Sequence, residues 1–190
     1  MTKLLNNILY GVPLQAVAGN MDIVVSNIVF DSRLVDKDDV FVAVHGTQVD
    51  GHDYIQKAID AGANAIVCSK LPKDLAKGIT YIEVTDSAES LGIMASNFYN
   101  KPSEKLKLIG ITGTNGKTTI ATLLHNLYQS AGYTSGLLST ISNKIGEKEY
   151  PATHTTPDAL HLNKMLAEMI ESGKVRSILE RLAVIRDGKT

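Results

Sequence analysis

The stretch GITGTNGKTT, from Gly110 to Thr119, has residue types and spacing suited to holding the phosphates of a nucleotide. It follows an apolar run that predicts a strand and precedes a segment whose apolar residues recur at helical spacing. A loop between a strand and a helix presents backbone N–H groups at the positive end of the helix dipole. Glycines at 113 and 116 let the backbone approach an anion closely. The stretch therefore predicts a phosphate loop.

Two side chains add chemistry to these backbone groups. The ammonium of Lys117 can lie between the terminal phosphates, and the hydroxyl of Thr118 can hold a Mg²⁺ ion bound to them. The strict pattern G-x-x-x-x-G-K-[ST] requires a glycine at position 111, which is isoleucine here, so the loop is a variant. The alternative, a glycine-rich turn with an incidental lysine, does not explain the strand before it and the helix after it. The loop alone leaves kinases, GTPases, ligases, motors and regulators open.

The elements that position this loop follow an α/β pattern in two units. Residues 1–100 predict one small α/β domain, and residues 101–190 predict a second domain that begins with the phosphate loop. The boundary is the polar, proline-containing stretch NKPSEK at 100–105. Strands that alternate with helices indicate parallel sheets with crossover connections. We therefore expect an α/β fold.

Individual elements are predicted from apolar patterns. Strands are expected within NIVFDSR, DVFVAV, ANAIVCS and ITYIEV of the first unit, and within LKLIGIT and TSGLLST of the second. Helices are expected within DYIQKAIDAG, DSAESLGIMASNFY, TTIATLLHNLYQSAG and TTPDALHLNKMLAEMIESG, the last with a threonine cap. In the third of these helices the predicted core stripe is Ile120, Leu123, Leu124, Leu127, Tyr128 and Ala131, and His125 lies off that stripe.

Composition excludes several function classes. A net charge of −1 provides no general attraction for nucleic acid or an anionic membrane, so we expect neither as a partner. Cys68 is the only cysteine, which excludes an internal disulfide, and its apolar surroundings in NAIVCSK predict a buried core residue. No stretch reaches the roughly 20 apolar residues of a membrane span, and the N-terminus lacks the apolar region of a secretory signal. We expect a cytoplasmic protein.

The five histidines show no metal-ligand spacing, and no Ser/His/Asp or Cys/His arrangement can be argued from the sequence. No metal is therefore expected beyond a phosphate-bound Mg²⁺. Three stretches, one of them the phosphate loop itself, nevertheless narrow the class of protein. The stretch TGTNGKTT resembles the phosphate loop of the Mur ligases and of their folylpolyglutamate synthetase relatives. The stretches FDSRLVDKDDVFVAVHGTQVDGHDYIQKAIDAGANAIV and PATHTTPDAL resemble, in order and spacing, the Mur ligases that add the third amino acid to UDP-N-acetylmuramoyl-L-alanyl-D-glutamate.

The resemblance implies roles for particular residues. Phe30 and Ser32, with Thr47, Gln48 and Val49, would bind the uridine nucleotide. Thr155 and Thr156 would contact the muramoyl-peptide. ATP would be bound by Gly113, Thr114, Asn115, Gly116, Lys117, Thr118 and Thr119. Simpler interpretations exist: Asp31-Ser32 and Asp50-Gly51 could merely form turns, and Thr155 or Thr156 could only cap a helix.

The resemblance also implies an activity. ATP and Mg²⁺ would convert a carboxyl group of UDP-N-acetylmuramoyl-L-alanyl-D-glutamate into an acyl phosphate, and the amino group of a diamino acid, meso-diaminopimelate or lysine, would displace the phosphate. Lys117 would be the catalytic residue and Thr118 the metal ligand. Two alternatives stay open: a non-catalytic module that binds the UDP-muramoyl-peptide and ATP, and another kind of P-loop NTPase.

The resemblance stops near Gly173. The family pattern continues with a buried strand and a segment like E-V-S-S-H, but residues 174–190 read KVRSILERLAVIRDGKT. Val175, Ile178, Leu179 and Leu182 fall at helical spacing, which predicts a poor central strand. We therefore expect a truncated or frameshifted ligase that is poorly stable and catalytically silent as this 190-residue chain.

Overall fold

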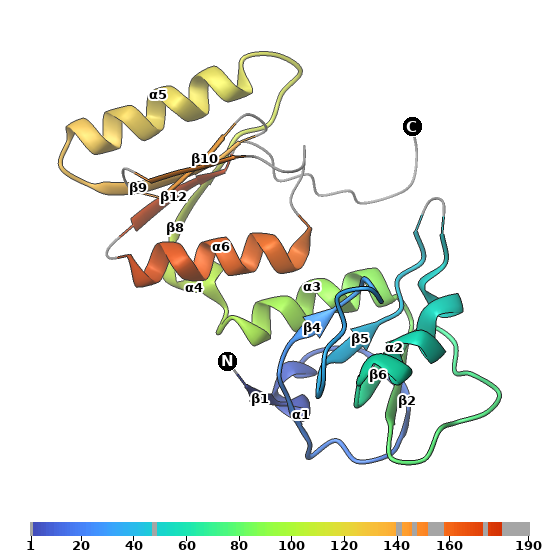
Figure 1. Ribbon diagram of the computed structural model, residues 1–190. Helices are drawn as coiled ribbons and strands as arrows, with labels where there is room; N and C mark the ends of the chain where they lie inside the picture. Colours follow the sequence, from blue (N-terminus) through green and yellow to red (C-terminus); the bar gives the residue numbers. More distant parts are fainter. Residues whose placement is uncertain are drawn as a thin grey trace. The chain divides into compact units, whose positions relative to one another are not determined.

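The computed structural model of the protein describes residues 2–46, 49–139, 142–145, 148–151, 158–172 and 175–179 (Figure 1). The chain divides into two compact units, Met1–Asn100 and Lys101–Thr190. Each unit contains one five-stranded sheet with helices packed against it. The α/β class expected from the sequence is confirmed. Within the described residues, no helix is long and apolar enough to cross a membrane.

The sheet of the first unit is mostly parallel. Its strands, in order across the sheet, are β2 Leu14–Ala18, β7 Thr80–Val84, β6 Ala65–Cys68, β5 Val40–Val42 and β4 Ile28–Val29. The strands β4, β5, β6 and β7 pair in parallel, and only β2 is antiparallel to its neighbour. Because parallel strands all end at the same edge, the segments that follow β4, β5 and β6 emerge together.

Both faces of this sheet are covered. Phe41, Ile66 and Tyr81 face the helix α2 Ile55–Ala61 and form one apolar cluster with it. Their neighbours in the strands, Val40 and Val67, are also fully buried, as expected for a parallel sheet between helices. The helix α3 Ser87–Phe98 buries Leu91, Met94, Ala95 and Phe98 on one face. Asp86 caps its N-terminus by accepting from two backbone N–H groups.

Short elements complete the first unit. They are β1 Lys3–Leu4, α1 Leu5–Ile8, β3 Val24–Val25 and the 3-10 helix η1 Gly51–Tyr54. The prediction that Cys68 lies in the core is confirmed, since its side chain is fully buried. That burial raises the pKa of the Cys68 thiol to about 11, so the thiol stays protonated at neutral pH.

The sheet of the second unit combines a parallel part with a hairpin. Its strands, in order, are β11 Lys148–Pro151, β10 Ser142–Ile145, β9 Thr134–Leu138, β12 Val175–Leu179 and β8 Lys107–Gly110. The strands β8, β12 and β9 are parallel, whereas β9, β10 and β11 form an antiparallel meander. The hairpin of β10 and β11 was not predicted from the sequence.

The strand β12 corrects our expectation for the end of the chain. Residues 174–190 were expected to make a poor central strand, yet Val175–Leu179 lie between β8 and β9 and pair with both. Four apolar residues at helical spacing are too few to decide between helix and strand, and the two open strand edges decide in favour of a strand. Residues 180–190 lie outside the described part of the chain.

Two helices cover this sheet on opposite faces, α5 Lys117–Ser130 and α6 Ala159–Glu171 (Figure 1). Consecutive residues of β9 alternate between them, because Leu137 packs in the cluster with α5 and Leu138 in the cluster with α6. A one-turn helix, α4 Pro102–Lys105, precedes β8 and contacts α6. The cap of α6 is Asp158, which accepts from the backbone N–H of His161, rather than the threonine expected from the sequence.

The buried face of α5 differs from the predicted stripe. Ala121 and His125 are buried, whereas Ile120, Leu123 and Leu127 are 48%, 62% and 63% exposed. The apolar residues of this helix span an arc wider than the sheet can cover, so the helix is rotated toward its small residue Ala121. His125 can point inward because a hydroxyl group on β9 meets it: Nδ1 of His125 lies 2.8 Å from Oγ of Ser135.

Candidate functional site

A cavity of about 490 Å³ lies at the edge of the first sheet where the parallel strands end. Its walls come from the segments that follow β4 and β5 and from the start of α2. Ligands of open α/β sheets bind at this edge, outside the carboxyl ends of the strands. The residues that line it are Phe30, Asp31, Ser32, Arg33, Phe41, Val44, Gly46, Val49, Gly51, Tyr54 and Lys57.

The cavity brings together three of the residues that the resemblance assigned to the uridine nucleotide. Phe30 and Ser32 come from the segment after β4, and Val49 comes from the hairpin after β5. Phe30 and Val49 are 39% and 54% exposed, so each offers apolar surface to a ligand, while Ser32 is buried. Thr47 and Gln48, predicted for the same pocket, lie outside the described residues.

The segment after β4 is a turn held by Asp31. The carboxylate of Asp31 accepts hydrogen bonds from the backbone and the guanidinium of Arg33, the shortest at 2.6 Å. These hydrogen bonds lower the pKa of Asp31 to about 2, so the carboxylate is ionised at neutral pH. The turn predicted for Asp31-Ser32 is therefore present, and it also directs Ser32 to the cavity. The two interpretations of this dipeptide are compatible.

The electrostatics of the cavity favour an anion. Arg33 and Lys57 supply two positive charges to its lining and Asp31 supplies one negative charge, which leaves one net positive charge at neutral pH. Tyr54 adds an aromatic ring, with the ammonium of Lys57 6.0 Å from the ring centroid. The sequence indicated none of Arg33, Tyr54 or Lys57 as site residues. Arg33 directly follows Ser32 in the chain, whereas Tyr54 and Lys57 carry no signal in the sequence.

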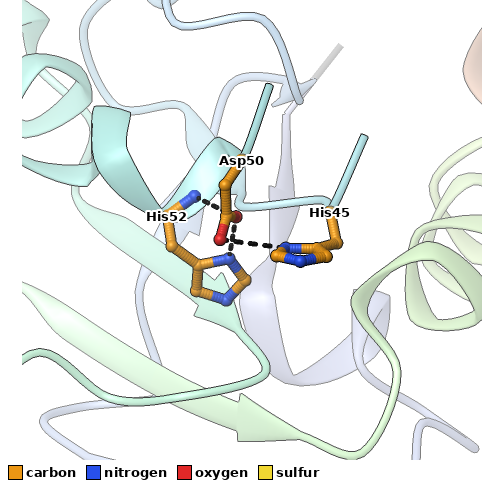
Figure 2. A group of neighbouring side chains, drawn as sticks. All are labelled: His45, Asp50 and His52. Carbon is orange, nitrogen blue, oxygen red and sulfur yellow. Dashed lines mark hydrogen bonds and ion pairs between the residues drawn. The ribbon is translucent and has the colours of Figure 1, made fainter. Parts of the chain in front are cut away.

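The hairpin after β5 carries a cluster that the sequence did not predict. Asp50 joins two histidines: its Oδ2 lies 2.9 Å from Nδ1 of His45, and its Oδ1 lies 2.6 Å from Nδ1 of His52 (Figure 2). The ligand atoms of these three side chains all lie within 4.8 Å of one another, a spacing that a metal ion could bridge. The cluster lines a second cavity of about 470 Å³, between the segments that follow β5 and β6.

The hydrogen bonds of His52 argue against a metal. Its Nε2 accepts the backbone N–H of Ser69 at 3.0 Å, so the ring proton must be on Nδ1, where it is donated to Asp50. If a metal bound Nδ1, the ring proton would have to move to Nε2. Nε2 could then no longer accept the hydrogen bond from the backbone N–H of Ser69, and two donors would face each other. The hydrogen-bonded arrangement of Asp50, His52 and Ser69 also resembles the Ser-His-Asp triad of serine hydrolases, with Ser69 Oγ 3.0 Å from Nε2. Since the Ser69 N–H already occupies that lone pair, His52 is not free to act as the base.

The phosphate loop of the second unit lies between β8 and α5. Gly116 is the N-cap of α5 with φ +78°, and Gly113 has φ +152°, conformations that side-chain-bearing residues rarely adopt. Among the described residues, a Cβ atom at Gly113 would have only the carbonyl oxygen of Asn115, 3.7 Å away, within 4 Å. The first turn of α5 contains no acidic residue, so nothing there opposes an anion at the helix terminus.

Lys117 lies over this loop. Its ammonium donates to the carbonyl of Gly113 at 2.6 Å and to that of Thr114 at 3.4 Å. The loop is mostly exposed, with Thr114 and Asn115 at its tip. Thr118 is half-buried in the first turn of the helix. The arrangement fits the phosphates of a nucleotide in the donors it offers. Thr155 and Thr156, predicted to contact the peptide, lie outside the described residues.

The fold is that of an α/β protein with a glycine-rich loop between a parallel strand and a helix. Family models make the class specific: residues 24–99 match the Mur ligase family, catalytic domain, and residues 111–181 match the Mur ligase middle domain. The chain belongs to the Mur ligase family. The second match continues through β12, past the point at which the resemblance was expected to stop.

Curated relatives support this assignment. The chain is 50% identical over 177 residues to a UDP-N-acetylmuramoyl-L-alanyl-D-glutamate--2,6-diaminopimelate ligase of Cytophaga hutchinsonii. The aligned residues cover 93% of this chain and 36% of the relative. It is 47% identical over 176 residues to the ligase of the same name from Phocaeicola vulgatus, again with 93% and 36% covered. The chain therefore spans about a third of the length of the curated relatives that it matches.

Solved structures show the same fold. A UDP-N-acetylmuramoyl-L-alanyl-D-glutamate--2,6-diaminopimelate ligase superposes with a TM-score of 0.72 at 23% identity, over 94% of this chain and 36% of that one. The MurF ligase of Thermotoga maritima in complex with ADP superposes with a TM-score of 0.54 at 25% identity, over 80% and 31% of the two chains.

Proposed function

We propose that this chain is the part of a ligase that binds a uridine-nucleotide substrate and supplies the phosphate loop for ATP. The ligase would add a diamino acid, 2,6-diaminopimelate by similarity to its curated relatives, to UDP-N-acetylmuramoyl-L-alanyl-D-glutamate. The observation that carries the proposal is the single cavity lined by Phe30, Ser32 and Val49. These residues were assigned to one ligand from sequence resemblance alone, and they come from segments separated in the chain.

The cavity suits a uridine nucleotide chemically. Phe30 and Tyr54 provide aromatic surface for a planar base, and the Ser32 hydroxyl can both donate to and accept from the edge of a uracil or a ribose. Arg33 and Lys57 provide the positive charge that a diphosphate requires. Aromatic surface and a hydroxyl group combined with two cations fit a nucleotide better than they fit a neutral sugar.

The phosphate loop suits ATP with Mg²⁺. Backbone N–H groups at the start of α5 can bind phosphate oxygens, and the Lys117 ammonium is within reach of them because it already lies over the loop. The Thr118 hydroxyl, in the first turn of the same helix, would be a ligand of the Mg²⁺ ion. When bound, ATP supplies the phosphoryl group that activates the substrate carboxyl. Lys117 and the loop amides would stabilise the negative charge on that group during transfer.

Two other functions were open from the sequence. Family membership removes the unrelated P-loop NTPase. The non-catalytic binding module differs from the ligase only in turnover, and both place the substrate and ATP in the same sites. Because the chain covers 36% of its curated relatives, we expect it to bind both ligands and to ligate nothing by itself. A cytoplasmic location stays a prediction from the sequence.

The test is calorimetric titration of the 190-residue chain with UDP-N-acetylmuramoyl-L-alanyl-D-glutamate and, separately, with ATP and Mg²⁺. The proposal predicts saturable binding of one molecule of each. Lack of binding of the uridine nucleotide by the folded chain would refute the assignment of the cavity. A phosphate-release assay with both substrates and 2,6-diaminopimelate then separates the two functions. Turnover by this chain would show that it is a complete catalyst and would contradict our expectation of silence.

A further inference from the structure

The hairpin that follows β5 forms one wall of the cavity lined by Phe30, Ser32 and Val49. Both backbone and side-chain hydrogen bonds hold this hairpin. The backbone N–H of Gly51 donates to the carbonyl of Val44 at 2.9 Å, and the N–H of Gly46 donates to that of Val49 at 3.0 Å. Gly46, Val49 and Gly51 all line the cavity. Any shift of this hairpin therefore changes the shape of the pocket.

Asp50 stabilises the hairpin on its outer side. Its carboxylate accepts from the backbone N–H of His52 at 3.0 Å and from Nδ1 of the same residue at 2.6 Å, and it contacts Nδ1 of His45 across the hairpin at 2.9 Å (Figure 2). The bonds from His52 and His45 lower the pKa of Asp50 to about 2, so the carboxylate remains an acceptor at all pH values near neutral.

His52 connects Asp50 to the neighbouring strand. Its Nε2 accepts from the backbone N–H of Ser69, the residue directly after β6. One imidazole thus links the segment that follows β5 to the segment that follows β6. The side chain of His52 is mostly buried, 17% exposed, so water does not compete strongly for these bonds. The ring is tied at both nitrogens, which fixes its orientation and its tautomer.

The backbone beside this link has no room to adjust. A Cβ atom at Gly51 would lie 2.7 Å from both the N and the O of Val44. The hairpin strands are therefore in direct backbone contact, and a displacement at His52 or Asp50 is transmitted to Gly51 and Val49 rather than absorbed locally.

We propose that Asp50 and His52 are positioning residues for the uridine nucleotide: the Asp50–His52–Ser69 link holds the hairpin wall in the conformation that binds the ligand. Neither side chain needs to touch the ligand, because both act through Val49 and Gly51. This inference rests on the proposed function of the cavity. The His45–Asp50–His52 cluster then has a structural role, and neither metal binding nor hydrolysis is assigned to it.

The experiment compares binding of UDP by four forms of the full chain: wild type, His52→Leu, His52→Gln and Gln56→Leu. Leucine removes both hydrogen bonds, whereas the amide of glutamine can accept from Ser69 and donate to Asp50. Gln56 lies in the adjoining cavity and outside the link, which makes Gln56→Leu the matched control. We expect His52→Leu to weaken UDP binding about tenfold, His52→Gln to restore most of that loss and Gln56→Leu to bind like the wild type.

A second measurement tests directly whether the Asp50–His52–Ser69 hydrogen bonds are present. Nitrogen NMR of the wild type should show His52 protonated at Nδ1 and unprotonated at Nε2, and hydrogen exchange should show a protected Ser69 amide. If His52→Leu does not fold, Asp50→Ala removes the same link from its other end, with the same weakening expected. Equal UDP affinity in wild type and a folded link variant would overturn this inference and leave the proposed function intact. Failure of the wild type to bind UDP, despite the expected tautomer, would overturn both.

Discussion

His125 of α5 and Ser135 of β9 meet in the interior of the second unit, with 2.8 Å between Nδ1 and Oγ. Both side chains are buried, at 4% and 0% exposure. The hydroxyl of Ser135 also lies 3.2 Å from the carbonyl oxygen of His125, to which it donates. The imidazole therefore presents Nδ1 to a polar partner in an otherwise apolar interface between helix and sheet.

This contact predicts that the second unit loses stability in mild acid. Burial, and to a lesser extent the charge of Lys144, lowers the pKa of His125 below its ordinary value of 6.5. Below pH 6.5 the unfolded chain takes up a proton that the folded chain resists, so the free energy of unfolding falls as pH falls from 7 to 5. The slope contributed by one histidine is at most about 1.4 kcal/mol per pH unit.

Urea unfolding followed by amide hydrogen exchange in α5 and β9 measures this slope. The variant His125→Gln keeps a polar side chain that does not titrate, so its slope over the same range should be shallower. Identical slopes for the two proteins would show that His125 is not the titrating group.

A second prediction concerns the contact between β9 and α6. A Cβ atom at Gly136 would lie 2.5 Å from Sδ and 2.6 Å from Cε of Met169, which is fully buried. Gly136→Ala should therefore destabilise the second unit by about 1–2 kcal/mol, because Met169 must move within a packed core. Gly92→Ala, at a helical glycine where no atom of the described residues lies within 4 Å of the added atom, should not destabilise the chain.

A double-mutant cycle tests the cause of that loss. Met169→Ala alone should cost about 2–5 kcal/mol, as expected for a large-to-small substitution in a core. Combined with Gly136→Ala it should cost less than the sum of the two, since the alanine at 136 would occupy part of the space that the methionine leaves. Strict additivity would mean that the two residues do not constrain each other.

The third prediction concerns the phosphate loop. Lys117→Ala should weaken ATP binding by tenfold or more, because the proposed site would lose the ammonium that is expected to contact phosphate oxygens. Binding of the uridine nucleotide, in the other unit, should not change. Titration of the variant with both nucleotides measures the two affinities. Comparable losses for both ligands would point to unfolding rather than to a role in phosphate binding.

The fourth prediction concerns the cavity lined by Phe30, Ser32 and Val49. Ser32→Ala should weaken UDP binding by about fivefold to tenfold, the usual effect of losing one hydrogen bond in a buried site. Leu34→Ala is the control, since Leu34 is two residues away, 71% exposed and outside the lining of the cavity. An unchanged affinity in Ser32→Ala would remove Ser32 from the binding site.

The sequence predicted most of the elements that carry the sites. The phosphate loop was predictable because glycine, lysine and threonine have separate physical roles at fixed offsets. Phe30, Ser32 and Val49 could be assigned only through resemblance, since a buried serine and an exposed valine have no chemical signature of their own. Arg33, Tyr54 and Lys57 join them through the pairing of β4 with β5 and the packing of α2, which no local pattern reports.

Two errors have the same physical origin. The strand β12 was missed because four apolar residues fit both periods, and pairing with β8 and β9 chose the strand. His125 was expected off the core because it lies off the apolar stripe of its helix, but Ser135 offers it a partner from β9. In both cases a contact distant in the sequence outweighed a local preference. The His45–Asp50–His52 cluster was unpredictable for the same reason, since its spacing matches no metal or catalytic pattern.

The most direct test of the account is NMR mapping of UDP-N-acetylmuramoyl-L-alanyl-D-glutamate on the isotope-labelled chain. We expect the largest shifts of backbone amide signals at Phe30–Arg33 and around Val49 and Gly51. Mg²⁺-ATP should instead shift signals at Gly113–Thr119. Shifts by the uridine nucleotide that avoid the cavity after β4 and β5 would contradict the account, even if the nucleotide binds.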